Sequence, residues 1–490
     1  MRQQSILALV IVAAVGAVQA TPLNPTGQVL ARWTAPSPVV LQSLRDAGIT
    51  TVFVPFQPGQ AATAKTVPLI ADLPQAASLS MLSESAAAAK RAGYVAAAVT
   101  ATGDLPSFRQ FLNAQKDFIQ FVYLKPEQLD WDVSPAHAVL ESGTWPGLHD
   151  LDTGAAGASE RPWLDANLHL YEYLRAFYPH RLPLLSYHPK NPSASLHSVE
   201  TALAEAFAGG GNTILEFPDS YRQRVARSDP RALAALRSLG KLAAFIKAQR
   251  NLPRVSNGAR TAVLSQSLEQ AEEILNLAYR NNLAPRALPV TPHPLWDTNH
   301  IRIVAAVNLN VEPDTAKSLV EFLQTGGKVL TAPATAGKPQ KWWETAAPRQ
   351  LRTQGSSTAY AAGKGEVYVY PEPVSDPSEF ALDLMEVAGA DNVEGIGLRG
   401  LDFRVWNTGV VLGTLYQNPG EKIVLLTSYG SEQDYDLLLS VRGEFSAASY
   451  EDTYTNGPRA LTVMQRPGRV ELDLKTVRRL GIVRLKEKTQ

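Results

Sequence analysis

Segments typical of β-strands and of α-helices alternate along residues 28–250, and this alternation limits the possible folds more than any other feature of the chain. Short apolar or β-branched runs predict strands, and apolar residues spaced three and four apart predict helices. The strands are expected at 51–56, 67–71, 94–99, 118–124, 136–141, 182–187 and 213–217, and the main helices at 39–47, 83–92, 164–177, 198–208 and 231–250. Repeated units of this kind predict an α/β fold with a parallel sheet.

Two arrangements of these units are open at this point. In the first, the strands close into a (β/α)-barrel-like domain over residues 28–250, with one strand missing or irregular. In the second, they form an open, doubly wound sheet. We favour the barrel.

Residues 258–395 begin a second alternating pattern, with strands expected at 261–264, 301–307 and 328–330. This pattern predicts a flavodoxin-like α/β middle domain. From about residue 400 to the end the helical spacing disappears, and short strands are separated by turns such as the one at Asn456-Gly457. The last part is therefore expected to be an antiparallel β-sandwich.

Residues 1–20 have the features of a cleavable secretory signal peptide. Arg2 supplies the positive charge, an uncharged apolar run follows, and Val18-Gln19-Ala20 offers small or modest side chains at the cleavage site. The apolar run, about 14 residues long, is shorter than the roughly 20 residues that a transmembrane helix needs. A retained N-terminal anchor is the alternative. We expect a secreted or periplasmic protein with no membrane span after signal cleavage.

The composition argues against several classes of function. The 46 basic and 46 acidic residues cancel, whereas nucleic acids and anionic membranes require a concentrated basic surface. The absence of Cys excludes disulfides, thiol catalysis and thiolate-bound metals. Residues 258–375 contain no Gly-x-Gly-x-x-Gly motif and no phosphate loop, and the chain contains no Gly-x-Ser-x-Gly nucleophile elbow. We therefore expect no cofactor and no nucleic acid partner.

The order of barrel, α/β domain and small β-domain resembles that of the bacterial β-galactosidases of glycoside hydrolase family 42. The stretch 314–331 is similar to their trimerisation domain, which is related to class I glutaminases but here lacks the catalytic Cys. Residues 422–429, followed by 437–445, look like the C-terminal β-domain of many glycosidases. This resemblance implies a carbohydrate partner and a homo-oligomer. The paired Asn-Glu signature of the family has no counterpart, because no Asn-Glu dipeptide occurs in the chain.

Three glutamates are candidates for a two-carboxylate mechanism, which requires carboxyl groups about 5–5.5 Å apart in retaining glycosidases and about 6.5–9.5 Å apart in inverting ones. Glu216 lies near the end of the last barrel strand, where a nucleophile or base is expected. Its alternative is a buried acid paired with Arg222 or a backbone donor. Glu127 and Glu141, each after a strand-like run, are candidate acids, and the alternative for Glu127 is a solvated turn residue.

The loop at 142–161 has a composition that suits a sugar-binding cleft. Trp145 offers an aromatic face, and His149 and Asp150 offer groups that bind hydroxyls. The alternative is that residues 145–147 only pack the loop against the barrel.

Tyr187 and His188 end another strand and are candidate substrate-binding residues. The alternative is a hydrogen-bonded structural histidine. The spacing of the histidines and acids in this region does not support a metal site.

Two functions follow from these features. The first is an exported glycoside hydrolase-like protein that acts on an oligo- or polysaccharide by a two-carboxylate mechanism. The second is a catalytically inactive relative that serves as a glycan-binding or envelope assembly module.

Overall fold

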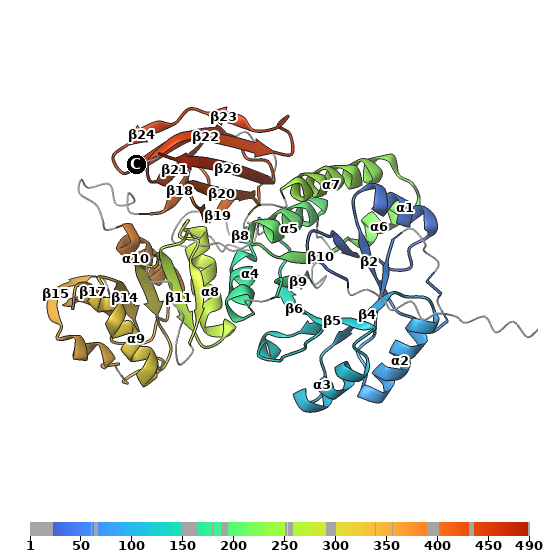
Figure 1. Ribbon diagram of the computed structural model, residues 1–490, viewed down its shortest axis with the longest axis horizontal. Coiled ribbons are helices and arrows are strands. Elements are labelled where there is room, and N and C mark those ends of the chain that lie inside the picture. Colours follow the sequence, from blue (N-terminus) through green and yellow to red (C-terminus); the bar gives the residue numbers. More distant parts are fainter. Residues whose placement is uncertain are drawn as a thin grey trace, which may run out of the picture.

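The computed structural model describes residues 23–59, 61–62, 67–148, 164–178, 181–187, 195–249, 252, 258–290, 300–338, 340–354, 356–389, 401–430 and 436–488. Three parts follow one another along these residues: a barrel, a mixed sheet with helices, and two antiparallel sheets (Figure 1). No helix in these ranges has both the length and the apolar character needed to cross a membrane.

Eight parallel strands close into a barrel in the order β1-β10-β9-β6-β5-β4-β3-β2, which confirms the barrel and excludes the open sheet. The strands are β1 (Leu30–Arg32), β2 (Thr51–Pro55), β3 (Leu69–Asp72), β4 (Ala96–Thr100), β5 (Ile119–Leu124), β6 (His137–Gly143), β9 (Leu184–Tyr187) and β10 (Asn212–Glu216). The strand missing from the sequence-based count is β1. Its three residues are too few for an alternating pattern to show.

Helices surround the barrel strands, and most of them begin after a residue whose side chain replaces a missing backbone partner. They are α1 (Pro38–Asp46), α2 (Leu79–Arg91), α3 (Leu105–Ala114), α4 (Leu168–Phe177), α5 (Leu196–Ala208), α6 (Asp219–Ala226) and α7 (Pro230–Ala248), with a short 3-10 turn, η1 (Pro126–Gln128), and a small strand pair, β7 (Gly147–Leu148) and β8 (Leu164–Asp165). Five of these helices follow a Ser or Asp whose side chain accepts a hydrogen bond from the first turn.

The middle domain is built on a sheet in the order β12-β11-β13-β14-β17-β16-β15. Its first five strands are parallel and have the 2-1-3-4-5 order of flavodoxin-like folds, as predicted, whereas the last two are antiparallel. The elements are β11 (Thr261–Ser265), α8 (Leu268–Arg280), β12 (Arg286–Pro289), β13 (Ile303–Ala306), α9 (Pro313–Gln324), β14 (Lys328–Thr331), η3 (Trp342–Ala346), β15 (Arg349–Gln354), β16 (Ser357–Ala362), β17 (Gly365–Val369) and α10 (Pro377–Gly389).

Two antiparallel sheets make up the C-terminal part, which confirms the predicted β-sandwich. One sheet contains β18 (Phe403–Trp406), β21 (Leu437–Arg442), β25 (Arg469–Lys475) and β24 (Met464–Arg466). The other contains β19 (Val411–Asn418), β20 (Glu421–Ser428), β26 (Leu480–Glu487), β22 (Phe445–Asp452) and β23 (Arg459–Leu461).

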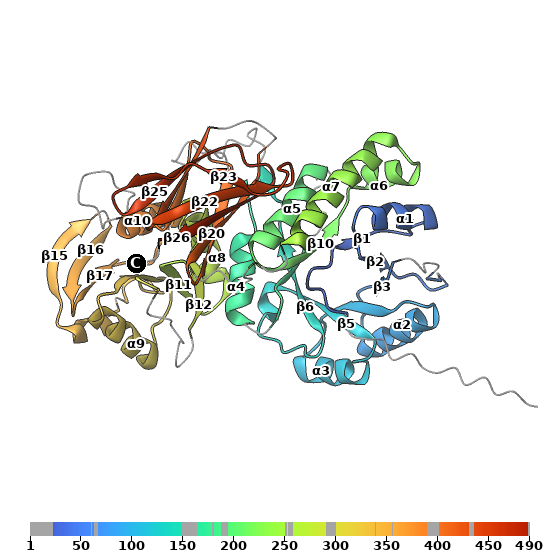
Figure 2. The ribbon, with the colours of Figure 1, turned by 45° about the horizontal axis from the view of Figure 1, so that its top comes forward.

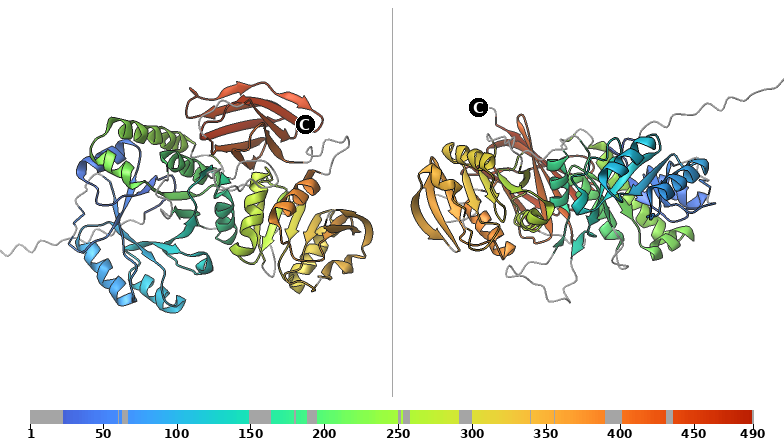
Figure 3. Two further views of the ribbon diagram at one scale, coloured as in Figure 1. Left: turned by 180° about the vertical axis from the view of Figure 1, so that it is seen from behind. Right: turned by 90° about the horizontal axis from the view of Figure 1, so that it is seen from below.

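The barrel contacts the other two parts through two of its helices. Helix α4 lies against α8 and β12 of the middle domain, between that domain and the barrel strands (Figure 2). Helix α5 lies against β20 and β26, and the β-domain covers the junction between barrel and middle domain (Figures 1 and 3).

A buried carboxylate joins the barrel to the β-domain. Glu205 of α5 is fully buried and accepts hydrogen bonds from the Tyr429 hydroxyl at 2.5 Å and from the Asn167 amide side chain at 2.8 Å. The Asn167 backbone N–H donates to the same carboxylate at 2.5 Å. Asn167 in turn accepts a bond from the backbone N–H of Thr144 at 2.8 Å. One acid therefore fixes a β6–β7 connection, a barrel helix and the β-domain together.

Candidate active site

Charged and polar side chains follow the apolar inner layer of the barrel on several strands. Because successive side chains of a strand point to opposite faces, residues two apart share the barrel interior. The pairs, each with its apolar inner residue first, are Leu30 and Arg32 on β1, Ile70 and Asp72 on β3, Phe121 and Tyr123 on β5, Val139 and Glu141 on β6, and Ile214 and Glu216 on β10. The second member of each pair lies toward the carboxyl end of its strand, the end at which barrel enzymes place their active sites.

Arg32 lies at the centre of this polar layer. Its Nε is 2.7 Å from Oδ2 of Asp72, and its Nη1 donates to Oε1 of Glu216. Its guanidinium also stands over the ring of Tyr123, 5.2 Å from the ring centroid. The side chains of Arg32, Asp72 and Glu216 are only 14%, 15% and 6% exposed. One planar guanidinium therefore holds two largely buried carboxylates, a geometry that suits Arg better than Lys.

The electrostatics of the layer keep one cation and raise the pKa of one acid, Asp72. Burial acts to lower the pKa of Arg32, but the charges of Tyr123, Asp72 and Glu216 together outweigh it and raise that pKa, so the guanidinium stays charged. Burial raises the pKa of Asp72; Arg32 opposes this rise, and the charge of Glu141 adds to it. Asp72 therefore holds a proton more readily than a solvated aspartate does.

The structure places Glu216 in this layer with a partner that the sequence did not indicate. Glu216 is 4% exposed and is therefore a buried, paired acid. Its partner is Arg32, however, and not Arg222, which forms an ion pair with Asp219 on α6. Arg222 is close to Glu216 along the chain, but α6 begins after β10 has ended, and Asp219 lies one turn away from Arg222 on that helix.

The two candidate acids lie in different surroundings. Glu141, in β6, is half-buried and acts electrostatically on Asp72, so it belongs to the polar layer. Glu127 lies in η1 after the end of β5 and is exposed. Glu127 is therefore a solvated turn residue, which is the alternative given for it above.

Trp145 and Tyr187 contact each other. Their rings stack with centroids 5.1 Å apart and planes inclined by 21°. Tyr187 is fully buried, and its hydroxyl lies 3.4 Å from that of Tyr171 on α4, in the core between strands and helices. The half-buried Trp145 thus packs its loop against the barrel strand that carries Tyr187, which is the alternative given for it above. His149, Asp150 and His188 lie outside the described residues.

The sequence did not identify Arg32, Asp72 and Tyr123 as members of a site. Asp72 carried a usable signal, since it follows directly on the predicted strand 67–71 at its carboxyl end. Arg32 carried none, because β1 was not recognised as a strand. Tyr123 lies inside an apolar run, and nothing in the sequence distinguishes it from the core residues around it.

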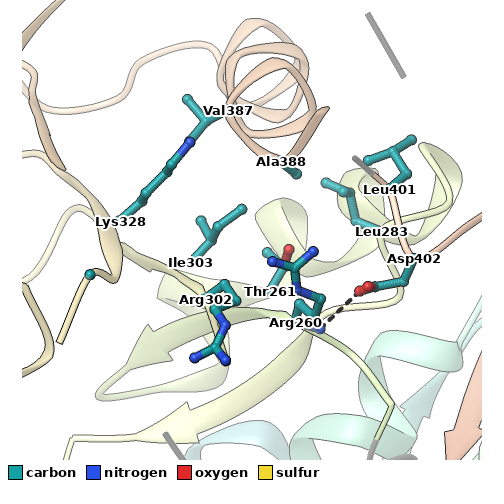
Figure 4. A pocket seen from close by; sticks show the side chains of 11 residues that line it. Arg260, Thr261, Leu283, Arg302, Ile303, Lys328, Val387, Ala388, Leu401 and Asp402 are labelled. Carbon is teal, nitrogen blue, oxygen red and sulfur yellow. Dashed lines mark hydrogen bonds between the residues drawn. The ribbon is translucent and has the colours of Figure 1, made fainter. Parts of the chain in front are cut away.

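A small cavity of about 80 Å³ lies in the middle domain (Figure 4). Arg260, Arg302 and Lys328 line it at the amino ends of three strands, and Asp402 accepts a hydrogen bond from the Arg260 backbone N–H at 3.0 Å. Burial raises the pKa of Asp402 to about 6 despite the opposing charges of Arg260 and Lys422. The guanidinium groups of Arg260 and Arg302 point in opposite directions (Figure 4), so they do not converge on one anion.

Within the part of the chain that the structure describes, no three His, Asp or Glu side chains are grouped so that they could hold a metal ion.

Comparison with solved structures identifies the fold. The chain is similar to α-L-fucosidase isoenzyme 2 from Paenibacillus thiaminolyticus, with a TM-score of 0.55 and 8% identity over 94% of this chain and 100% of that one. A family 42 β-galactosidase, Gan42B from G. stearothermophilus, matches with a TM-score of 0.44 and 12% identity over 78% of this chain and 67% of that one. A rhamnosidase from Novosphingobium sp. PP1Y has a TM-score of 0.45 and 10% identity over 79% and 38%.

No protein-family profile matches the chain, and no curated protein matches it in sequence. The structural likeness therefore concerns the fold: the protein has a glycoside hydrolase-like barrel with the domain order that the sequence indicated.

Proposed function

We propose that this protein is an exported glycoside hydrolase that cleaves an oligo- or polysaccharide with carboxyl groups of its barrel. The observation that carries the proposal is the polar layer in which Arg32 holds Asp72 and Glu216 beside Glu141 at the carboxyl ends of the strands. The glycoside hydrolase-like fold supports it, because such barrels place their chemistry at this end.

Glu216 takes the role of nucleophile or base. It touches a permanently charged guanidinium, which favours the carboxylate form that either role requires. Two nitrogens of that one guanidinium hold Asp72 and Glu216, so the two carboxyl groups lie beside the same cation.

The pair of Asp72 and Glu141 takes the role of the acid. The pKa of Asp72 is raised by burial and by the charge of Glu141, and a raised pKa keeps a proton available for a leaving sugar oxygen. Asp72 is held by Arg32, so Glu141 is the member of the pair that we expect to face the substrate.

The test is a hydrolysis screen against oligo- and polysaccharides with wild type, Glu216→Gln and the control Glu127→Gln. Loss of a positioned acid or base costs about 10²–10⁴-fold in rate, so we expect at least about a hundredfold loss for Glu216→Gln. The exposed Glu127 should tolerate its change without loss of rate. Equal rates for wild type and a folded Glu216→Gln protein, checked by circular dichroism, would exclude the assignment.

The second candidate function is a glycan-binding protein without catalysis. One observation favours it: Arg32 engages two of the three carboxylates, and the Glu216 side chain is only 6% exposed. In that case a glycan would bind without being cleaved by any variant, and Glu216→Gln would leave its affinity unchanged.

Export is the part of the proposal that rests on residues 1–20. We expect the protein isolated from the periplasm or medium of a bacterial host to begin at Thr21, because signal peptidase cleaves after Ala20. N-terminal sequencing checks this. A chain that retains Met1 in the membrane fraction would instead indicate an anchor.

A further inference from the structure

A cavity of about 120 Å³ lies between the barrel and the middle domain, beside helices α4 and α8. A water molecule needs about 10–15 Å³ in the same measure, so the cavity has room for a small organic ligand. It is separate from the polar layer of the barrel. None of Arg32, Asp72, Tyr123, Glu141 and Glu216 is among the described residues that line it.

The charge of the lining favours a cation. Asp165, Glu272 and Glu273 contribute three carboxyl groups, and the described residues that line the cavity include no Lys or Arg. A cavity lined by one sign of charge concentrates ligands of the opposite sign.

Buried polar atoms in the lining supply an independent sign of a ligand. His169 on α4 is 5% exposed, and neither of its ring nitrogens makes a hydrogen bond with the described residues. Its Nε2 lies 3.6 Å from Oε1 of Glu272, too far for a hydrogen bond. Oδ1 of Asn276 on α8 is likewise buried and without a hydrogen-bond partner among these residues. Such atoms are rare in folded proteins and call for an explanation.

Hydrogen-bond acceptors predominate among the charged and polar side chains of the lining. A neutral imidazole has one acceptor nitrogen, an amide oxygen only accepts, and ionised carboxylates only accept. A primary ammonium group carries three donors and no acceptor, which makes it complementary to this lining.

We propose that this cavity binds the ammonium group of a small primary amine, either an amino sugar or a simple polyamine. Its ligand contacts are His169 from the barrel and Glu272 with Asn276 from the middle domain. The bound amine therefore links the two domains. The proposal does not depend on the proposed hydrolase activity, because the described lining of the cavity includes none of the carboxylates of the polar layer.

Calorimetric titration of the full mature protein with glucosamine, putrescine and glucose tests the proposal. We expect glucosamine to bind and glucose not to bind. Binding of putrescine as well identifies the amine in general as the ligand, whereas binding of glucosamine alone identifies an amino sugar. Equal affinity for glucose and glucosamine, or no binding of either amine, overturns the proposal whatever the outcome of the hydrolysis screen.

Two variants on helix α8 locate the site. Glu272→Gln removes one charge-assisted hydrogen bond, and we expect it to weaken glucosamine binding about tenfold. The control is Glu269→Gln, an exposed position on the same helix that does not line the cavity, which should leave the affinity unchanged. Equal weakening by the two variants would place the amine elsewhere. The Glu272 side chain is 42% exposed, so its replacement is compatible with folding.

Discussion

Replacement of Arg32 by Met is expected to lower the free energy of unfolding of the barrel by about 3–5 kcal/mol at pH 7, which is the cost of removing one partner of a buried ion pair. The variant would leave Asp72 and Glu216, side chains only 15% and 6% exposed, without the guanidinium between them. Glu141 would add to the repulsion, because its charge already acts on Asp72.

Urea unfolding at pH 7 measures this loss, and Arg222→Met is the matched control. Arg222 pairs with the largely exposed Asp219, and exposed pairs contribute about 0–1 kcal/mol. We also expect the deficit of Arg32→Met to shrink toward pH 4, because protonation removes the uncompensated negative charges. A loss for Arg32→Met no larger than for Arg222→Met would show that the polar layer does not hold the barrel together.

The second large effect concerns Glu205 and is a dependence of stability on pH. Burial raises the pKa of Glu205 from its ordinary value of 4.5 to about 7, although hydrogen bonds from Tyr429 and Asn167 act in the opposite direction. The folded state therefore binds this proton more tightly than the unfolded state does. The resulting stabilisation is complete below pH 4.5 and is lost as the pH rises to about 7. At about 1.4 kcal/mol per pH unit, the loss amounts to about 3 kcal/mol.

The contribution of Glu205 is measured as the difference between wild type and Glu205→Gln, because other carboxyl groups titrate in the same range. Free energies of unfolding at pH 4.5 and pH 8 should fall more steeply for wild type than for the variant. Gln places an N–H₂ group opposite the Asn167 donor, which adds a cost that does not vary with pH. Parallel pH profiles for the two proteins would contradict the raised pKa.

Much of the fold could be predicted from local patterns. The barrel strands β2 to β6, β9 and β10 each contain enough apolar residues to show as a run, and the middle sheet and the β-sandwich were predicted for the same reason. The short β1 was not predicted, because three residues are too few to show an alternating pattern. Its place between β2 and β10 is decided by closure of the barrel.

The candidate site could be predicted only in part. Glu216 and Glu141 stood out because each is an acid at the end of an apolar run. Glu127 has the same local signal, yet η1 places it in solvent. The three glutamates cannot be told apart from the sequence, because the sequence shows where each lies relative to a strand. It does not show whether the side chain points into the barrel.

The sequence by itself determined the order of three domains, their classes and the presence of acids at strand ends, because these depend on the spacing of residues along the chain. Only the tertiary structure decided that Arg32 and not Arg222 is the partner of Glu216, and that Asp72 and Tyr123 belong to the same layer. Arg32 and Glu216 occupy matching positions on adjacent strands although 184 residues separate them. That proximity is created by barrel closure, a long-range event that leaves no mark in local sequence.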